Sequence, residues 1–401
     1  MNPRVLVISL LLSVALSVRA GDSIAYGFRH ALTLDARAAY AFPSYRDDIL
    51  RDYLNVDQAK DTRIATSIHL QYGFSFPSGS GQGRIYPGAW QGIGTAVNFL
   101  GNPEGIGTPV SVYAFQGAPI WWFSDRLSLY YEWNFGASFG WRPCDGQTAH
   151  SNLIVGSRVN AYINLGAGLS YRINDSYSIV AGIDLTHYSN GNTSFPNPGV
   201  NMSGVRIGVT RFMGRRNIGD FTDGNVGSNY SGKDECDLKK RPEFDLTVYG
   251  SLRKRVYRGG DEPILLNGHF AVAGLDFAPM WKITRNFRAG ASADFQWDES
   301  TDLKRHYVEG SGVDDIRFTR PPFLNQVCVG LSGRAELVMP IFSVNVGIGY
   351  NVIGPEETRA SYQLANLKVR LTHALFVNIG YQLLNFQKQN NLMLGLGYTF
   401  R

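Results

Sequence analysis

The chain carries a histidine and a serine two residues apart, His187 and Ser189, in the segment HYSNGNTSFPNPGVN at residues 187–201. A serine hydroxyl is a poor nucleophile until a neighbouring imidazole can accept its proton. A His-x-Ser pair on one side of a strand could therefore support nucleophilic catalysis. The pair alone is a weak signal, because polar strand ends often contain both residue types. The strand that contains the pair helps to distinguish a catalytic pair from an ordinary polar strand end.

The preceding sequence, YSIVAGIDLTHYSN, alternates as a β-strand does. Successive strand residues face opposite sides. His187 and Ser189 thus share a side with four apolar residues: Ile179, Ala181, Ile183 and Leu185. In the next strand, two-residue steps back from the outward Val205 lead to Asn201. We therefore expect His187, Ser189 and Asn201 to meet on the outer side of a wall of strands, near its rim. Polar groups facing lipid are costly, although a strand end that enters the headgroup layer is a plainer explanation.

The composition of the chain is typical of an outer-membrane β-barrel. It contains 45 Gly, 21 Tyr and 23 Phe residues, yet its mean hydropathy is only −0.14. Such values are expected where only alternate residues meet lipid and aromatic girdles mark both interfaces. A secreted soluble β-sandwich would also alternate, but its polar face would be richer in Lys and Glu. The predicted fold class is all-β, a transmembrane antiparallel β-barrel of about 14 strands, with about 12 to 16 as the range.

The domain organisation follows from the two ends of the chain and one polar break. Residues 1–20 have the layout of a secretory signal peptide, and no later apolar stretch is long enough for a conventional transmembrane helix. Residues 213–242 are expected to be a loop or linker between about eight strands and about six. Because six lipid-facing strands could hardly close alone, we expect residues 21–401 to form one large barrel. The last strand ends in Phe400, which resembles the assembly signal of outer-membrane proteins and implies insertion by the barrel-assembly machinery.

Several classes of function are excluded or disfavoured. The net charge of +5 is not gathered in any stripe that would indicate a nucleic-acid-binding protein. Cys144, Cys236 and Cys328 are too few for a disulfide framework and too widely spaced for a zinc site. One bridge remains possible. Glycine pairs such as those near Gly92 do not open helices and are better explained as strand or turn residues than as a phosphate cradle. We expect neither a metal nor an organic cofactor.

Beyond the His-x-Ser pair, the longer segment resembles the active-site region of the PagL lipid A deacylases, which are outer-membrane β-barrel serine hydrolases. Seven residues fall on matching family positions without a gap: His187, Tyr188, Ser189, Asn190, Pro196, Asn197 and Gly199. Upstream text, including QGIGTAVNF and YYEWNFGASFGW, resembles the longer, acyloxyacyl hydrolase-like members of the group. The resemblance covers residues 60–212, and residues 243–401 resemble an extension found in long members.

The resemblance implies a role for each residue of the motif. Ser189 would be the nucleophile, His187 its general base, and Asn190, helped by the backbone near Asn192, would stabilise the oxyanion. The implied activity is hydrolysis of an acyl ester of lipid A, so lipopolysaccharide and outer-membrane lipid are the implied partners. The family has a glutamate at the third triad position, where this chain has Asn201. An amide can fix the imidazole tautomer but cannot stabilise imidazolium by charge.

Two further interpretations concern residues outside the motif. In the segment LRKRVYR, Arg253 and Arg255 are expected to face inward at the outer rim and Lys254 outward, where they could meet lipopolysaccharide phosphates. A solvated charged strand end is the plainer alternative. A different class of function is a passive pore or adhesion barrel that retains a degenerate motif. A barrel of fourteen strands could enclose a channel, into which Glu132 and Arg206 would point.

Overall fold

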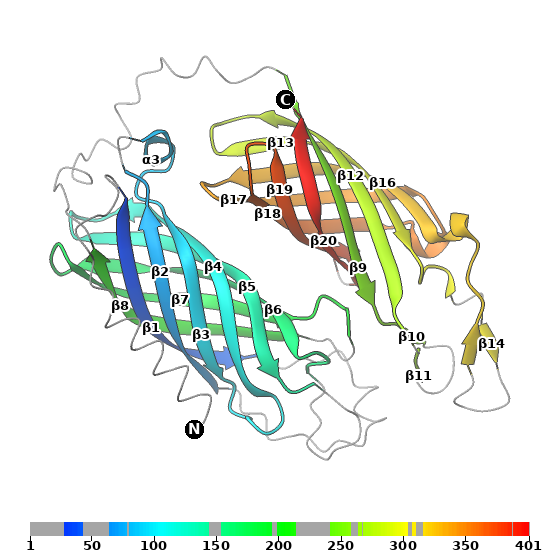
Figure 1. Ribbon diagram of the computed structural model, residues 1–401, viewed down its shortest axis with the longest axis horizontal. Helices are drawn as coiled ribbons and strands as arrows, with labels where there is room; N and C mark the ends of the chain where they lie inside the picture. The colour runs from blue at the N-terminus through cyan, green and yellow to red at the C-terminus, as the bar shows by residue number, and fades with distance from the viewer. Residues whose placement is uncertain are drawn as a thin grey trace. The chain divides into compact units, whose positions relative to one another are not determined.

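The computed structural model describes residues 28–42, 64–77, 80–143, 154–194, 199–213, 241–257, 264–266, 268–303, 307–309, 316–386 and 388–400. The signal peptide predicted at residues 1–20 lies outside these ranges, as do Cys144 and Cys236. The described chain divides into two compact units, each built around a closed antiparallel β-barrel (Figure 1). No helix in these ranges is long and apolar enough to cross a membrane.

The first barrel contains eight strands in sequential order, and β8 pairs with β1 to close the ring. Its strands are β1 (Arg29–Ala41), β2 (Ile64–Ser75), β3 (Trp90–Phe99), β4 (Gly107–Trp122), β5 (Leu127–Trp141), β6 (Val159–Arg172), β7 (Tyr177–Ser189) and β8 (Val200–Met213). One short helix, α3 (Gly81–Ile85), lies between β2 and β3.

The second barrel also contains eight strands, and β9 closes it by pairing with both β12 and β20. Its strands are β9 (Glu243–Arg253), β12 (Phe270–Lys282), β13 (Phe287–Asp298), β16 (Val327–Val338), β17 (Phe342–Ile353), β18 (Ser361–Arg370), β19 (Leu375–Leu384) and β20 (Lys388–Phe400). The connections carry two small hairpins and two 3₁₀ turns: β10 (Val256–Tyr257) with β11 (Ile264–Leu265), β14 (Tyr307–Glu309) with β15 (Ile316–Phe318), η4 (Phe323–Gln326) and η5 (Glu356–Thr358).

The predicted all-β antiparallel barrel fold is confirmed, but the prediction of a single large barrel is wrong. The predicted break at residues 213–242 does separate two sets of strands. The second set, however, has eight barrel strands, so it can close on itself as six could not. The sixteen barrel strands lie at the upper limit of the predicted range. An eight-stranded barrel is just wide enough for side chains to fill its interior, which removes the basis for a wide channel.

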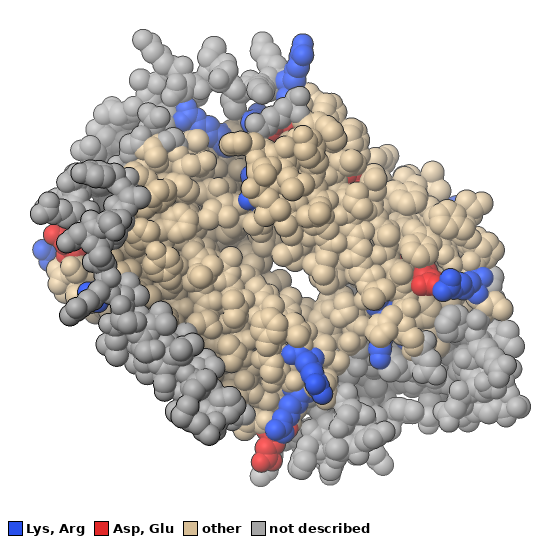
Figure 2. Space-filling view, viewed as in Figure 1, with Lys and Arg blue, Asp and Glu red and all other residues tan. Residues whose placement is uncertain are grey.

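The strands of the first barrel alternate between an apolar outer side and a polar inner side. Ile183 is 65% exposed and Ile207 63%, whereas Asp184 and Arg206 are each 4% exposed. On the face seen in Figure 2, few charged side chains interrupt the uncharged surface of the described residues. An apolar exterior of this kind is the lipid-facing surface of a transmembrane barrel.

The interior of the first barrel is filled by ion pairs and aromatic rings. Glu132 and Arg206 point inward as predicted, but they bind each other, with 2.7 Å between Oε1 and Nη1. Arg37 pairs with Asp35 at 2.7 Å and with Asp184 at 3.4 Å. Toward one end, buried aromatic side chains pack together: Tyr113, Phe115, Trp141, Tyr162 and Tyr188.

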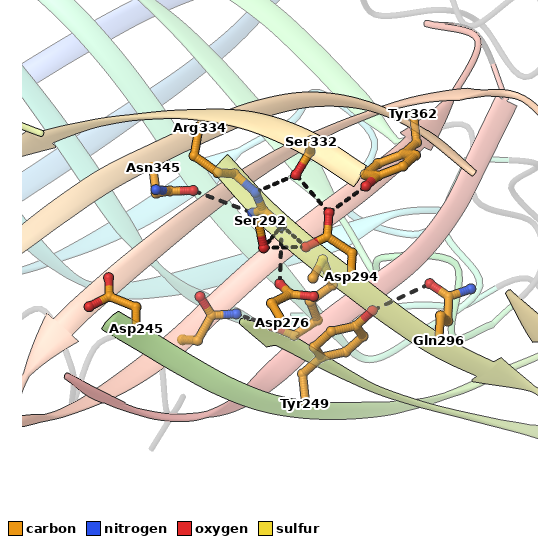
Figure 3. A network of polar contacts seen from close by, with 12 residues as sticks. Asp245, Tyr249, Asp276, Ser292, Asp294, Gln296, Ser332, Arg334, Asn345 and Tyr362 are labelled. Atoms are coloured by element: carbon orange, nitrogen blue, oxygen red, sulfur yellow. Dashed lines mark hydrogen bonds and ion pairs between the residues drawn. The ribbon is translucent and has the colours of Figure 1, made fainter. Parts of the chain in front are cut away.

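The interior of the second barrel holds a separate polar network (Figure 3). Arg334 lies 2.6 Å from Asp294 and 3.4 Å from Asp276, and Tyr362 donates a hydrogen bond to Asp294. Nearby, Lys368 bridges Glu336 at 2.8 Å and Asp245 at 2.9 Å. Because these buried charges are paired across different strands, they cross-link the wall from inside.

The two ends of the first barrel differ in the length of their connections. Tight turns at residues 123–126 and 173–176 join strands at one end, the short-turn end, where a longer connection, residues 76–89, carries α3. Residues 42–63, 142–158 and 190–199 join strands at the other, the long-connection end. β7 ends, and β8 begins, at the long-connection end.

Candidate active site

The candidate site lies where β7 leaves the barrel wall and β8 re-enters it. His187 on β7 stands opposite Asn201 on β8 in the strand register. His187 and Ser189 are half-buried and Asn201 is exposed, in line with the exposed outward residues Ile183 and Leu185. The structure therefore brings His187, Ser189 and Asn201 to the outer side of the barrel at its long-connection end, where the alternation placed them.

A hydrogen bond joins His187 to Asn201, with 2.7 Å between Nδ1 and Oδ1. Because an amide oxygen can only accept, Nδ1 carries the proton and Nε2 keeps a lone pair. An imidazole in this tautomer can accept a proton through Nε2, as the base of a serine hydrolase must. The hydrogen bond to Asn201 thus fixes the tautomer of the imidazole, which is one of the two tasks that an acid has in a catalytic triad.

Gly199 lies against both His187 and Ser189. Its φ is +73°, in the left-handed region that favours glycine. A Cβ at this position would lie 2.8 Å from the carbonyl oxygen of Tyr188, 3.2 Å from Cε1 of His187 and 3.6 Å from Cβ of Ser189. Both side chains consequently border the same small space, which only the absence of a side chain at residue 199 keeps open.

Ser189 and the imidazole of His187 are not hydrogen-bonded to each other in this structure. Within the part of the chain that the structure describes, the Ser189 hydroxyl makes no hydrogen bond. Catalytic hydrogen bonds often tighten only when substrate is bound. The arrangement therefore supplies a correctly oriented imidazole and a nearby hydroxyl without their mutual hydrogen bond.

The two oxyanion candidates lie in the turn that follows. Asn190 directly follows the last residue of β7, and its side chain is buried, with 7% of the residue exposed. Gly191 and Asn192 both have left-handed φ values, +64° and +68°, which reverse the chain sharply just after the serine. Pro196 and Asn197 lie outside the described residues.

The described part of the basic segment, Arg253 to Arg255, does not form an open phosphate site. Arg253 points inward as predicted, but it is 1% exposed and pairs with Asp298. It also donates to Ser300 and to the carbonyl oxygen of Asn390. Arg255 donates to the same Ser300 at 2.8 Å, and Lys254 is half-buried. An unpaired charge is costly in a barrel interior, and Asp298 already pairs with the buried guanidinium of Arg253. Arg253 is therefore not available to bind a phosphate.

Other places that could hold a ligand lie away from this site. Among the described residues, no group of His, Cys, Asp and Glu side chains could hold a metal ion. The first barrel has a cavity of about 130 Å³ toward its short-turn end, bordered by Phe115, Trp122 and Arg126 among others. The cavity shares no residue with the candidate site.

Two residues important to the geometry were assigned no role from the sequence. Gly199 follows a Pro-Asn-Pro stretch, and a glycine in such a turn is a signal for left-handed backbone. Because Tyr188 lies between His187 and Ser189, alternation puts its side chain on the inner side, but its hydrogen-bond partner is 90 residues away in sequence. No local pattern could have identified that partner.

Two family models match this chain. Residues 66–210 match the family model described as lipid A 3-O-deacylase (PagL), and residues 242–401 match the one described as acyloxyacyl hydrolase, C-terminal domain. No curated protein matches the chain.

Among solved structures, Neisserial surface protein A is similar with 11% identity over 45% of this chain and 96% of its own, at a TM-score of 0.31. The outer membrane enzyme PagL has 14% identity over 44% of this chain and 97% of its own, at a TM-score of 0.30. The attachment invasion locus protein Ail of Yersinia pestis has 12% identity over 47% and 99%, at a TM-score of 0.26.

Proposed function

Because this chain belongs to the PagL-type lipid A deacylase family, as a long member with an acyloxyacyl hydrolase C-terminal domain, we propose that it is a serine esterase that removes an acyl chain from lipid A. The observation that carries the proposal is the hydrogen bond from Nδ1 of His187 to Asn201 on the lipid-facing side of the wall. A His–Asn pair on the lipid-facing side is placed where a lipid ester can reach it.

The position of the site along the barrel suits this substrate. The family is one of the bacterial outer membrane, and in such barrels the short turns are periplasmic while longer loops are extracellular. The long-connection end therefore faces outward, and the site lies at the level of the outer leaflet that contains lipid A. Acyl chains would lie against exposed Leu185, Val205 and Ile207 while an ester bond reaches Ser189.

The proposed reaction proceeds in two steps. Oγ of Ser189 attacks the ester carbonyl while its proton passes to Nε2 of His187. The bond from the carbonyl carbon to the alcohol oxygen then breaks as Nε2 returns that proton to this oxygen, which belongs to the sugar or to a hydroxylated acyl chain, and the acyl group stays on Oγ. Water next attacks the acyl-enzyme with His187 again as base, which releases a fatty acid and free Ser189. Backbone N–H groups at the Gly191–Asn192 reversal, with Asn190, would stabilise the oxyanion.

Mass spectrometry of lipid A tests the proposal. Cells making the wild type are expected to lose one acyl chain from lipid A, and cells making Ser189→Ala are expected to keep it. Heat-modifiable migration in gels checks that both proteins are folded in the membrane. Identical lipid A in both strains, with both proteins folded, would overturn the proposal and favour a non-catalytic barrel that retains the motif.

A further inference from the structure

The active-site strand is anchored from behind by one residue, Tyr188, which lies between His187 and Ser189 and points into the barrel. Tyr188 is 2% exposed, and its hydroxyl donates a 2.9 Å hydrogen bond to Oδ1 of Asn98. Asn98 is itself 2% exposed and belongs to β3. In an eight-stranded ring, β3 and β7 are four strands apart, so this hydrogen bond spans the lumen between opposite walls.

Asn98 is a fixed point because all of its amide groups are engaged. Its Nδ2 donates to the carbonyl oxygen of Pro109 and to Oγ of Ser111, both at 3.0 Å. The amide can donate twice and accept from Tyr188 at the same time. Its orientation is consequently determined by β4, independently of β7.

Aromatic packing holds the ring of Tyr188 in line with this partner. Its centroid lies 5.1 Å from that of Trp141 and 5.4 Å from that of Tyr162. Trp141 is in turn fixed by a 2.7 Å hydrogen bond to Ser138. The side chain of Tyr188 therefore has little freedom to move once it is bound to Asn98.

The strand end needs such an anchor because its own ladder stops there. The pairing of β7 with β8 ends at Tyr188 opposite Val200, and Ser189 pairs only with Ala161 on β6. Beyond Tyr188 the nucleophile thus lacks a neighbouring strand on the side where His187 meets Asn201. A shift of this strand end would move Ser189 relative to His187.

We propose that Tyr188 is a positioning residue, whose hydrogen bond across the lumen to Asn98 holds Ser189 within reach of His187. The inference rests on the proposed function. A group that holds reacting atoms in place acts on the chemical step, since a displacement of about 1 Å can cost on the order of 100-fold in rate. Substrate binding on the outer side does not involve Tyr188.

The test compares Tyr188→Phe with Tyr162→Phe in the full-length protein in detergent micelles. Both variants remove one buried phenol hydroxyl from the same aromatic cluster, but the Tyr162 hydroxyl has no hydrogen-bond partner among the described residues. We expect Tyr188→Phe to lower kcat for lipid A, and the rate at which a fluorophosphonate probe labels Ser189, by about tenfold, with KM nearly unchanged. We expect Tyr162→Phe to behave as the wild type in both measurements.

Asn98→Leu removes the hydrogen-bond acceptor from the opposite wall. This variant tests the same hydrogen bond if Tyr188→Phe does not fold. If the hydrogen bond acts as a unit, the double variant with Tyr188→Phe is expected to be no slower than either single variant. Equal labelling rates for Tyr188→Phe and Tyr162→Phe, or additive losses in the double variant, would overturn the inference. Failure of the proposed function is distinguishable, because the wild type and Ser189→Ala would then leave lipid A equally acylated, whatever the labelling rates of the Tyr188 variants.

Discussion

At the scale of single residues, the unusual feature is an asparagine where the family has a glutamate. Asn201 accepts from Nδ1 of His187 at 2.7 Å and so fixes the tautomer that leaves Nε2 as the base. It carries no charge, however, so in the proposed reaction the imidazolium that would form when Ser189 gives up its proton would be stabilised less than by a carboxylate. Orientation and charge, two contributions that a triad acid normally combines, are separated in this site.

Asn201→Glu is therefore expected to raise the rate of lipid A deacylation, and Asn201→Ala to lower it. The glutamate can accept the same hydrogen bond and adds the missing negative charge beside His187. We expect a gain in kcat of roughly tenfold or more, as for a charge-assisted hydrogen bond replacing a neutral one. Turnover of lipid A in mixed micelles is the measurement. An unchanged or lower rate for a folded Asn201→Glu protein would contradict the idea that the missing charge at residue 201 limits the rate.

At the scale of elements, alternation along β7 and β8 predicted the outer side of the wall because lipid and lumen select different side chains. The turn between them was not predicted in the same way. Gly199 and Asn192 have left-handed backbones that depend on how the chain re-enters the wall. The number of barrels was likewise beyond local patterns, because closure of the second ring depends on β9 meeting β20. The residues paired in that ladder lie between 144 residues apart, for Gly250 and Leu394, and 156 residues apart, for Phe244 and Phe400, which is beyond any periodic signal. Sequence patterns therefore identified the strand faces and the shared side of His187, Ser189 and Asn201, whereas ring closure and turn conformation required the tertiary pairing.

The turn itself can be tested with Gly199→Ala. The added Cβ would lie 2.8 Å from the carbonyl oxygen of Tyr188 and 3.2 Å from Cε1 of His187, in addition to the cost of a left-handed alanine. Gly140→Ala is the matched control, because Gly140 also has a positive φ of +89° but its nearest neighbour would be 3.7 Å away. Both variants should lose about 1–2 kcal/mol of stability from backbone conformation, measured by urea unfolding in lipid vesicles.

Only Gly199→Ala is expected to lose deacylase activity as well, by about tenfold or more, because the clash displaces His187 relative to Ser189. If the two alanine variants had equal activity, Gly199 would have no part in the geometry of the site.

At the scale of the whole molecule, each barrel is complete in its own strand pairing and its own interior. Every barrel strand between residues 29 and 213 pairs only with strands of that range, and those between residues 243 and 400 pair among themselves. The buried charges are matched in the same way, with Glu132 bound to Arg206 in the first barrel and Asp294 bound to Arg334 in the second. A domain with its own closed sheet and its own core can in principle fold alone.

A chain shortened to residues 1–232 is accordingly expected to be exported, to fold and to deacylate lipid A, since His187, Ser189, Asn201 and the Tyr188–Asn98 hydrogen bond all belong to the first barrel. Heat-modifiable migration reports folding, and mass spectrometry of lipid A reports activity, with Ser189→Ala in the shortened chain as the control. A shortened protein that folds but leaves lipid A intact, while the full chain is active, would mean that residues 243–401 contribute to substrate binding or to the site. Equal activity of both lengths would instead assign the second barrel a role separate from the chemistry, because nothing in the reaction would then depend on its interior.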